Sequence, residues 1–285
     1  MPKVTVAILC MNSREHLEPL FQSLKEQTYK DFDTIVSDNG STDGTVEWLQ
    51  EHNIRFVANG KNLGFSGGMN IALRNVKTEY VVTLNDDMKL EPRCIEELVK
   101  AADADKTIGT IQGKILNWDG TKIDMIGTQI TYGSMIARKG VGKPATDFST
   151  SGYIDNAGAG GTLFRMEVLE QIGFFDESFN PAYYEDADLN ERIKKAGYKL
   201  FYQPTALVYH HHGATLKKMR PQASLSSHRN RYRLLKKHWT TGMWLKALPF
   251  LPFITAFYLL KMEKEYFIAT WEFLTGKLDQ TIWKP

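Results

Sequence analysis

Apolar segments alternate with segments of helical spacing over the first ninety residues, and this alternation limits the fold more than any other feature. Residues 4–10 form a nearly continuous apolar run, as expected for a strand covered on both faces. Residues 14–27 then place their leucines and Phe21 on one side of a helix. The alternation continues with strands expected at 32–37, 55–58 and 80–84, a helix at 45–51, and a glycine-rich loop leading into a helix at 64–75. Strands joined by helices pair in parallel through right-handed crossovers, so we predict an α/β fold with a mostly parallel sheet flanked by helices.

The pattern is less regular in the second half of the chain. The elements expected there are a hairpin strand at 128–132, short helices at 167–171 and 187–196, and strands at 200–202 and 206–210. After Ser226 the sequence is helical, basic and aromatic to its end. We therefore expect a C-terminal helical extension beside the α/β part.

Charge is distributed unevenly, although the formal net charge is only +2. No Asp or Glu lies between Glu191 and Glu263, a stretch that carries fourteen Lys and Arg residues. Such segregation predicts a basic face that meets phosphates or anionic lipid. The two cysteines, Cys10 and Cys94, have no metal-ligand spacing, and so low a count favours a reducing compartment.

The sequence predicts neither a signal peptide nor a membrane span. The amino terminus enters a strand-like run at once and has no stretch that leads to a small-residue cleavage site. The most apolar window, residues 247–260, is shorter than the roughly 18 to 20 residues of a membrane span and is interrupted by Pro249 and Pro252.

Two polar segments follow strands in the first half. The turn from Asp38 to Gly44 comes directly after the second expected strand, and the carboxylate of Asp38 could accept the imide N–H of a uracil or thymine ring. The alternative is a structural turn in which Asp43 caps the next helix. The glycine-rich segment 62–68 and Asn70 could approach a ligand closely, although glycine loops are common.

Two adjacent carboxylates, Asp86 and Asp87, follow the expected strand at 80–84. Such oxygen ligands suit Mg²⁺ or Mn²⁺ and can hold the cation against a diphosphate, whereas the alternative is a solvated acidic turn. Side chains alternate along an extended chain, so one carboxylate would face the metal and the other the sugar or ribose. Because ligands bind beyond the carboxyl ends of parallel strands, we expect this pair and Asp38 on one rim of the sheet.

Two further clusters carry ionisable groups. Asp186, preceded by Glu185, lies at the start of an expected helix, where its carboxylate could take a proton from a hydroxyl or cap the helix. His210 and His212 would share one face of the strand that they end. A neutral imidazole could supply a nitrogen ligand to the same cation, although a structural or surface histidine is commoner.

Taken together and in this order, these motifs resemble glycosyltransferase family 2, whose members share the GT-A fold. The similarity extends over roughly residues 3–240. Four segments resemble the bacterial rhamnosyltransferase-like branch: Asn62-Leu-Gly-Phe, Leu84-Asn-Asp-Asp, Gly173-Phe-Phe-Asp-Glu-Ser, and Arg229-Asn-Arg before Lys237-His238. The resemblance implies a catalytic domain at 1–226, divided into nucleotide-binding (1–106) and acceptor-binding (107–226) halves, and an amphipathic helical tail at 227–285.

The resemblance also implies a role for each candidate residue. Asp186 would be the general base, Asp87 a ligand of the divalent cation (Mn²⁺ or Mg²⁺), and His210 the second ligand, with His212 as the alternative. The residues expected around the nucleotide are Asn12, Asp38, Asn39, Ser41, Asn62, Gly64, Asn70 and Asp86. The residues expected at the diphosphate and the acceptor are Gly160, Gly161, Thr162, Glu185, His212, Arg229 and Arg231.

These roles imply an inverting glycosyltransferase. Asp186 would deprotonate an acceptor hydroxyl that attacks the anomeric carbon opposite the leaving nucleoside diphosphate, which the cation and an arginine stabilise. The donor would be a UDP- or dTDP-sugar, with dTDP-rhamnose as one candidate.

Two features depart from the family pattern. Met11 replaces a base-stacking aromatic residue, which leaves the identity of the base less certain. The Gln-x-x-Arg-Trp motif of processive members is absent.

The tail combines basic residues with aromatic and leucine-rich stretches, which suit the surface of an anionic membrane. A glycan acceptor linked to polyprenyl diphosphate would lie there, as expected for a cytoplasmic enzyme of surface-polysaccharide synthesis bound peripherally to the inner face of the cell membrane. The alternatives are helices packed back onto the catalytic domain or a homodimer contact. No recognised motif supports nucleic-acid binding.

Two other classes of function compete with this interpretation. A non-catalytic sugar-nucleotide-binding protein would bind the donor without turnover, although the set of Asp87, Asp186 and His210 argues against it. A nucleotidyltransferase also combines an α/β sheet with a carboxylate-bound metal. It normally carries a glycine-rich basic segment near the N-terminus, and residues 4–20 contain none.

Overall fold

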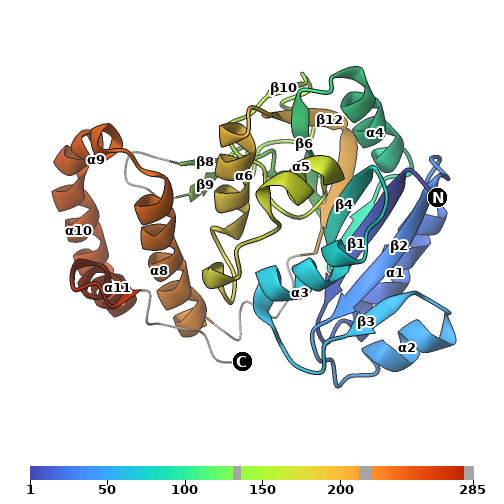
Figure 1. The fold of residues 1–285 in the computed structure, drawn as a ribbon, viewed down its shortest axis with the longest axis horizontal. Helices are drawn as coiled ribbons and strands as arrows, with labels where there is room; N and C mark the ends of the chain where they lie inside the picture. The colour runs from blue at the N-terminus through green and yellow to red at the C-terminus, as the bar shows by residue number, and fades with distance from the viewer. Residues whose placement is uncertain (131–135, 212–219, 279–285) are drawn as a thin grey trace.

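A ten-stranded sheet with helices on both faces dominates the computed structural model (Figure 1). The structure describes residues 1–130, 136–211 and 220–278. Its elements in chain order are β1 (Val4–Cys10), α1 (Arg14–Lys25), β2 (Phe32–Asp38), α2 (Thr45–Glu51), β3 (Phe56–Ala58), α3 (Gly64–Arg74), β4 (Tyr80–Asn85), β5 (Met88–Leu90), α4 (Cys94–Ala104), β6 (Ile108–Asn117), β7 (Ile123–Met125), β8 (Thr128–Ile130), β9 (Ile136–Arg138), β10 (Gly152–Tyr153), β11 (Thr162–Arg165), α5 (Met166–Ile172), η1 (Glu177–Phe179), α6 (Glu185–Lys195), β12 (Lys199–His210), α8 (Arg220–His238), α9 (Thr241–Ala247), η2 (Leu248–Phe250), α10 (Leu251–Leu260) and α11 (Lys264–Leu274).

The strand order is β10-β12-β6-β11-β4-β1-β2-β3, with β5 paired to β12 and β7 to β6. β1 runs parallel to β2 and β4, β2 runs parallel to β3, and β12 runs parallel to β6. β11 is antiparallel to both of its neighbours, β4 and β6. Helices α1, α2 and α3 make the crossovers between the parallel strands, so the predicted α/β class is confirmed.

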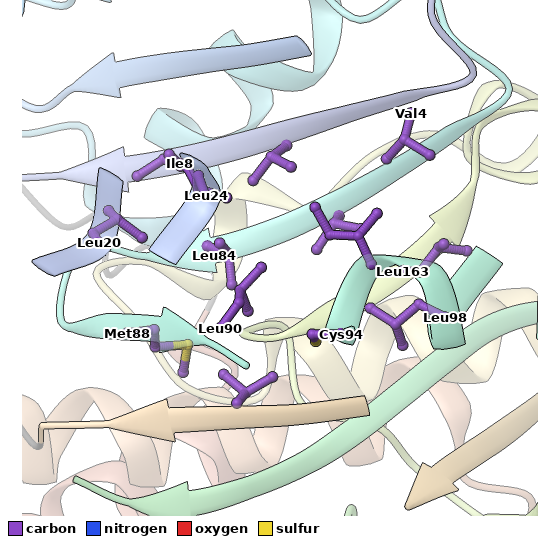
Figure 2. Close-up of a cluster of buried hydrophobic side chains, with 14 of the residues drawn as sticks. Val4, Ile8, Leu20, Leu24, Leu84, Met88, Leu90, Cys94, Leu98 and Leu163 are labelled. Carbon is purple, nitrogen blue, oxygen red and sulfur yellow. The ribbon is translucent and has the colours of Figure 1, made fainter. Parts of the chain in front are cut away.

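The sheet is covered by a hydrophobic core on each face. Along β1, Val4, Val6 and Ile8 belong to one cluster with residues of α1 and α4, whereas Ala7 belongs to the other cluster with residues of α3, α5 and α6. Figure 2 shows the first cluster, in which Ile8 lies near the α1 leucines. The period-two alternation of a strand explains this division, because successive side chains point to opposite faces. Both faces of β1 are therefore buried, as its continuous apolar run predicts.

Three element boundaries differ from the sequence-based expectation. Helix α3 begins at Gly64, so the glycine-rich loop expected from residue 64 onward is already helical. Helix α6 begins at Glu185 instead of residue 187. The two strands expected at 200–202 and 206–210 form one strand, β12, whose pairing with β6 shifts register between Gln203 and Leu207. A bulge of this kind accommodates Pro204, which has no N–H to donate to the neighbouring strand.

The hairpin strand expected at 128–132 is present in part. β8 covers Thr128–Ile130 and pairs antiparallel with β9. The rest of the expected segment lies outside the described residues.

The C-terminal helices lie beside the sheet domain, and α8 is the one next to α6 (Figure 1). Helix α8 begins at Arg220, before the residue 227 expected as the start of the tail. Its Leu234 packs with Phe179, Tyr184 and Ala187, and α11 packs on α8 through Tyr232 and its neighbours.

Residues Thr241–Leu260, which comprise α9, η2 and α10, form a helical run of 20 residues that is long and apolar enough to cross a membrane. This criterion concerns length and composition alone. The continuous helical run nevertheless contradicts the expectation that Pro249 and Pro252 interrupt the apolar stretch. The two prolines lie in the first turns of η2 and α10, where a helix has no intrahelical partner for the missing N–H.

Candidate active site

Three parallel strands, β1, β2 and β4, end at the same edge of the sheet. Their register places Cys10 opposite Asp38 and Leu9 opposite Asn85. The acidic pair Asp86-Asp87 therefore follows β4 at the edge from which the loop after Cys10 and the turn at Asp38 also start. The predicted common rim is present.

Asp38 is buried at the end of β2, and its carboxylate organises the turn that follows. Oδ2 accepts from the backbone N–H groups of Gly40 and Ser41, each at 3.1 Å, and Oδ1 accepts from the Ser41 hydroxyl. The Ser41 hydroxyl accepts from the backbone N–H of Asn12 at 2.8 Å. The Asn12 side chain in turn accepts from the backbone N–H of Thr42 at 2.8 Å. These bonds join the turn to the loop after β1.

Asn39 connects the same turn to the glycine-rich segment. Its side-chain N–H group donates to the carbonyl of Gly64 at 2.9 Å and to Asn62 Oδ1 at 3.3 Å, and its Oδ1 accepts from Asn59 at 3.0 Å. Gly64 has a φ of +72°, and a Cβ at this position would collide with the side chain of Asn180. Glycine is thus required where α3 begins.

Asp86 is held against the loop after β1. Its Oδ2 accepts from the backbone N–H of Met11 at 3.1 Å and from the hydroxyl of Ser13. Burial raises the pKa of Asp86 to about 6, and the charge of Asp87 adds to this shift while the hydrogen bond from Ser13 opposes it. Sequence reasoning missed Ser13, because nothing in a single serine before a helix distinguishes a partner of Asp86 from an ordinary cap.

Asp87, in the turn between β4 and β5, and His210, at the end of β12, lie close together although they are far apart in the sequence. Asp87 Oδ1 lies 3.3 Å from His210 Nε2. Two ligands at right angles around one octahedral ion, each at about 2.1 Å, are separated by about 3 Å. The two side chains therefore fit a shared divalent cation.

His210 has a further buried partner, Asp124 of β7. Its Nδ1 lies 2.9 Å from Asp124 Oδ2, and Arg138 of β9 donates to Asp124 Oδ1 at 2.6 Å. Burial alone would lower the pKa of His210, but the hydrogen bonds with Asp124 and Asp87 outweigh it and raise the pKa to about 9. A carboxylate on the far nitrogen is the usual support of a metal-binding histidine. Asp124 was missed by sequence reasoning, and its only signal is an acidic residue between the apolar Ile123 and Met125.

His212, the alternative metal ligand, lies outside the described residues. Within residues 1–130, 136–211 and 220–278, no three His, Cys, Asp or Glu side chains gather in a way that could hold a metal ion. A cation at Asp87 and His210 would thus take further ligands from elsewhere, and Mg²⁺ sites commonly take them from substrate phosphates and water.

The glycines before β11 allow close packing beside the acidic pair. A Cβ on Gly160 would meet Met88 Cε at 2.6 Å, and Gly161, with a φ of +68°, would meet Val208 Cγ2 at 2.9 Å. Thr162 is fully buried, and its hydroxyl donates to the carbonyl of Gly158 at 2.6 Å.

Asp186 and Glu185 open α6 after an unusual turn. Tyr183 and Tyr184 both have left-handed backbone conformations, with φ of +79° and +72°, which cost about 1 to 3 kcal/mol each for residues other than glycine. The Asp186 carboxylate accepts from the backbone N–H of Ala187 at 2.7 Å, and no side chain caps the helix. Burial raises the pKa of Asp186 to about 6 and, together with the neighbouring Asp186 charge, raises that of Glu185. A carboxylate with a pKa near neutrality suits a general base.

The segment that leads to Asp186 is hydrogen-bonded to the start of α3. The backbone N–H of Phe65, at the start of α3, donates to the carbonyl of Pro181 at 2.8 Å. Gly64 is itself bonded to Asn39, next to Asp38. A chain of contacts thus connects the turn at Asp38 with the turn before Asp186.

Three predicted residues have partners elsewhere in the protein. The Asn70 side chain donates to the carbonyl of Phe175 at 2.9 Å and accepts from its N–H at 3.0 Å. Arg229 makes a two-pronged ion pair with Glu272 of α11, at 2.6 and 2.7 Å. Arg231 is 2% exposed, and its guanidinium packs against the ring of Tyr232. The side chains of Asn70 and Arg229 are thus engaged within the protein, whereas Nε and Nη1 of the buried Arg231 have no hydrogen-bond partner among the described residues.

The sheet topology and its flanking helices define the class of fold, which is GT-A. A family model described as Glycosyl transferase family 2 matches residues 5–173, which is more than half of the chain. The chain therefore belongs to glycosyl transferase family 2. This membership favours sugar transfer over the nucleotidyltransferase alternative.

Among curated relatives, the chain is similar to an N-acetylglucosaminyl-diphospho-decaprenol L-rhamnosyltransferase of Mycobacterium tuberculosis (strain ATCC 25618 / H37Rv). The two are 26% identical over 261 residues, which cover 82% of this chain and 83% of the relative. It is also similar to a poly-beta-1,6-N-acetyl-D-glucosamine synthase of Staphylococcus epidermidis, at 23% identity over 72% of this chain and 49% of that protein. The similarity to the first relative supports the resemblance to the rhamnosyltransferase-like branch.

Solved structures share the fold at low sequence identity. S. aureus TarS 1–349 in complex with UDP-GlcNAc has a TM-score of 0.67 and 16% identity, and the match covers 95% of this chain and 80% of that one. GalNAc-T7 with UDP, GalNAc and Mn²⁺ has a TM-score of 0.68 and 15% identity, covering 85% of this chain and 49% of that one. In a further TarS structure the chain spans 41% of the length. These likenesses establish the fold and no more.

Proposed function

We propose that the protein is a metal-assisted, inverting glycosyltransferase of cell-surface polysaccharide synthesis. It transfers a sugar from a UDP- or dTDP-sugar to a hydroxyl of a glycan acceptor, which is free or linked to polyprenyl diphosphate. The observation that carries the proposal is the pairing of Asp87 with His210, 3.3 Å apart, on the rim where β2 ends in Asp38. The mycobacterial relative, by its name a rhamnosyltransferase acting on a decaprenol diphosphate, supports dTDP-rhamnose and a lipid-linked acceptor as the first candidates.

The nucleoside would lie over the turn at Asp38. This turn contains Asn39 and Ser41, and the Ser41 hydroxyl accepts a hydrogen bond from the backbone of Asn12. Asn39 donates to Asn62 and Gly64 of the glycine-rich segment. Both lone pairs of Asp38 Oδ2 are used by N–H groups of its own turn, so Oδ1, which accepts from the Ser41 hydroxyl, would be the oxygen that accepts the imide N–H of the base.

The diphosphate would lie beside the acidic pair. Asp87 and His210 would hold the divalent cation, which supplies charge stabilisation to the departing diphosphate. Asp86, which accepts from Met11 and Ser13, would lie at the donor sugar. Gly160 and Gly161 would lie on the acceptor side, where their lack of a Cβ lets the backbone pack against Met88 and Val208, and the buried Thr162 hydroxyl donates to the carbonyl of Gly158.

Asp186 would act as the general base. A hydroxyl bound beside Glu185 and Asp186 would pass its proton to the Asp186 carboxylate while its oxygen bonds to the anomeric carbon. The bond from that carbon to the diphosphate oxygen breaks in the same displacement, so the anomeric configuration inverts. A base with a pKa of about 6 is ionised at neutral pH and ready for this step.

A panel of donors tests the proposal directly. UDP- and dTDP-sugars are first screened by thermal shift with Mn²⁺ present, and each one that binds is then offered with polyprenyl-diphosphate-linked and free glycan acceptors. We expect turnover with at least one donor and a product of inverted anomeric configuration by NMR. Binding without turnover across the panel would favour the alternative, a non-catalytic sugar-nucleotide-binding protein.

We also propose that the protein associates peripherally with the inner face of the cell membrane through its C-terminal helices. Only 11% of the most apolar window of Thr241–Leu260 is buried. The large hydrophobic side chains exposed on these helices are Met243, Leu245, Leu248, Phe250, Phe253, Phe257, Leu259, Leu260, Met262, Phe267, Ile268, Trp271 and Leu274. Lys246, Lys261 and Lys264 accompany them, a combination that suits the surface of anionic lipid.

Liposome flotation with anionic lipid tests this association. A triple variant, Leu245→Gln, Phe253→Gln and Leu260→Gln, should lose binding, because these side chains are 62%, 75% and 86% exposed and contribute little to the core. Val141→Gln, at an exposed position in the sheet domain, serves as the control and should float like the wild type. Undiminished flotation of the triple variant would exclude these helices as the anchor, and a change in oligomeric state would support the dimer alternative.

A further inference from the structure

Asn230 of α8 is fully buried and faces the turn that carries the candidate base. Its side-chain N–H group donates to the carbonyls of Phe179, Ala182 and Tyr183 at 2.8, 3.0 and 2.9 Å. Its Oδ1 accepts from Arg233 at 2.8 Å, so both ends of the amide are engaged. One side chain thus forms hydrogen bonds with three backbone carbonyls of residues 179–184. We call these residues the base-carrying turn, because they lead directly into Glu185 and Asp186 at the start of α6.

The base-carrying turn needs such an anchor. Tyr183 and Tyr184 are left-handed, a conformation that side chains other than glycine avoid, and Glu185 starts α6 immediately afterwards. The direction in which the first turn of α6 presents Asp186 therefore depends on the path of Tyr183 and Tyr184. Buried carbonyls left without donors would favour another path.

The rest of the same face of α8 reinforces this contact. Leu234, one helical turn after Asn230, packs with Phe179 and Tyr184. Lys237 reaches both Asp176 at 2.7 Å and Asp188 at 2.8 Å. The opposite side of α8 packs on α11, where the Tyr232 hydroxyl lies 2.6 Å from that of Thr270. Helix α8 therefore holds the segment on both sides of the base.

We propose that Asn230 is a positioning residue for sugar transfer: it fixes the base-carrying turn and thereby the place of the Asp186 carboxylate. This inference rests on the proposed role of Asp186 as the general base. The proposal gives a function to the asparagine of the Arg229-Asn-Arg segment. Among the described residues, Asn230 makes no hydrogen bond with Asp186 or Asp87, so it would act through the backbone of the turn.

Asn230→Ala removes both donors and should lower kcat about 10- to 100-fold, the scale expected when a catalytic group is misplaced by about 1 Å. The affinity for UDP with Mn²⁺, measured by calorimetry, should be unchanged, because the turn at Asp38 and the pair at Asp87 are untouched. Hydrogen exchange should accelerate in peptides covering 179–189 and not in those covering β1 and β4. Tyr232→Phe, which removes a hydrogen bond from the opposite face of α8, is the matched control and should leave kcat unchanged.

A double-mutant cycle separates positioning from general stability. In an Asp186→Asn background, adding Asn230→Ala should cause no further loss of transfer, because there is no base left to misplace. A further loss as large as in the wild type would overturn the proposal, as would a kcat of Asn230→Ala equal to that of the wild type. If Asn230→Ala does not fold, Asn230→Ser, which keeps one donor, replaces it in the same measurements.

The cycle also distinguishes failure of this inference from failure of the proposed function. A fully active Asn230→Ala variant beside an inactive Asp186→Asn variant would overturn the positioning role alone. A fully active Asp186→Asn variant would overturn both, since Asn230 would then have no base to position.

Discussion

Replacing Asp186 with asparagine is expected to lower the rate of sugar transfer on the order of 10²- to 10⁴-fold, the range that general acid–base groups contribute. Asparagine keeps the size of the side chain and can still accept the N–H of Ala187, so α6 should be unaffected. It cannot take up the proton of the attacking hydroxyl. The affinity for UDP should therefore remain that of the wild type, and the loss should lie in kcat.

Initial rates and UDP calorimetry check this expectation. Glu191→Gln, which removes a carboxylate paired with Lys194 at 2.6 Å on the same helix, is the control and should change neither quantity. Because burial raises the pKa of Asp186 to about 6, kcat/KM of the wild type should fall below about pH 6 as the carboxylate becomes protonated. The Asp186→Asn variant should lack this acidic limb. A variant with the wild-type rate would contradict the assignment of the base.

The sheet domain could be predicted from the sequence because its signals are local. The apolar run of β1 and the one-sided apolar spacing of α1 report directly which faces are buried. Parallel pairing then follows from the alternation of the two element types, and it places the strand ends on one rim. The positions of Asp38 and Asp86-Asp87 at that rim are thus consequences of topology.

Features that depend on tertiary contacts could not be predicted in the same way. Three glycines near the start of α3 suggested a loop, but Gly64 is needed there because Asn180, from a distant segment, leaves no room for a Cβ. The sequence predicts separate strands at 200–202 and 206–210, yet the neighbouring β6 continues its pairing across a bulge, so they form one strand, β12. In both cases the deciding partner lies far away in the sequence.

The candidate site shows the same limit. The pairing of Asp87 with His210 was inferred from family resemblance, and the strand ends alone would not have indicated it. Asp124 supports His210 from β7, a strand of three residues whose place depends on its pairing with β6. Asn230 meets the base-carrying turn only because α8 folds back on α6. Supporting residues of this kind carry almost no local signal, whereas the strand-end carboxylates carry a strong one.

Replacing Asp87 with alanine is expected to abolish metal-dependent transfer, with a loss on the order of 10²- to 10³-fold, the scale found when one group that stabilises developing charge is removed. Without Asp87, His210 would be the remaining proposed protein ligand among the described residues, and a hard divalent cation binds poorly to one imidazole. Asp31→Ala, at an exposed position just before β2, is a control that removes a carboxylate from the opposite edge of the sheet.

Two measurements together decide the role of Asp87. Electron paramagnetic resonance of Mn²⁺ in the presence of UDP should show bound metal in the wild type and in Asp31→Ala, and little or none in Asp87→Ala. Transfer by the wild type should stop in excess chelator and return when Mn²⁺ is added. Turnover that persists in excess chelator would contradict the metal role, and so would full Mn²⁺ binding by Asp87→Ala. The fit of Asp87 and His210 to one cation would then reflect an ion pair between two side chains, since a protonated imidazole 3.3 Å from a carboxylate gives the same geometry.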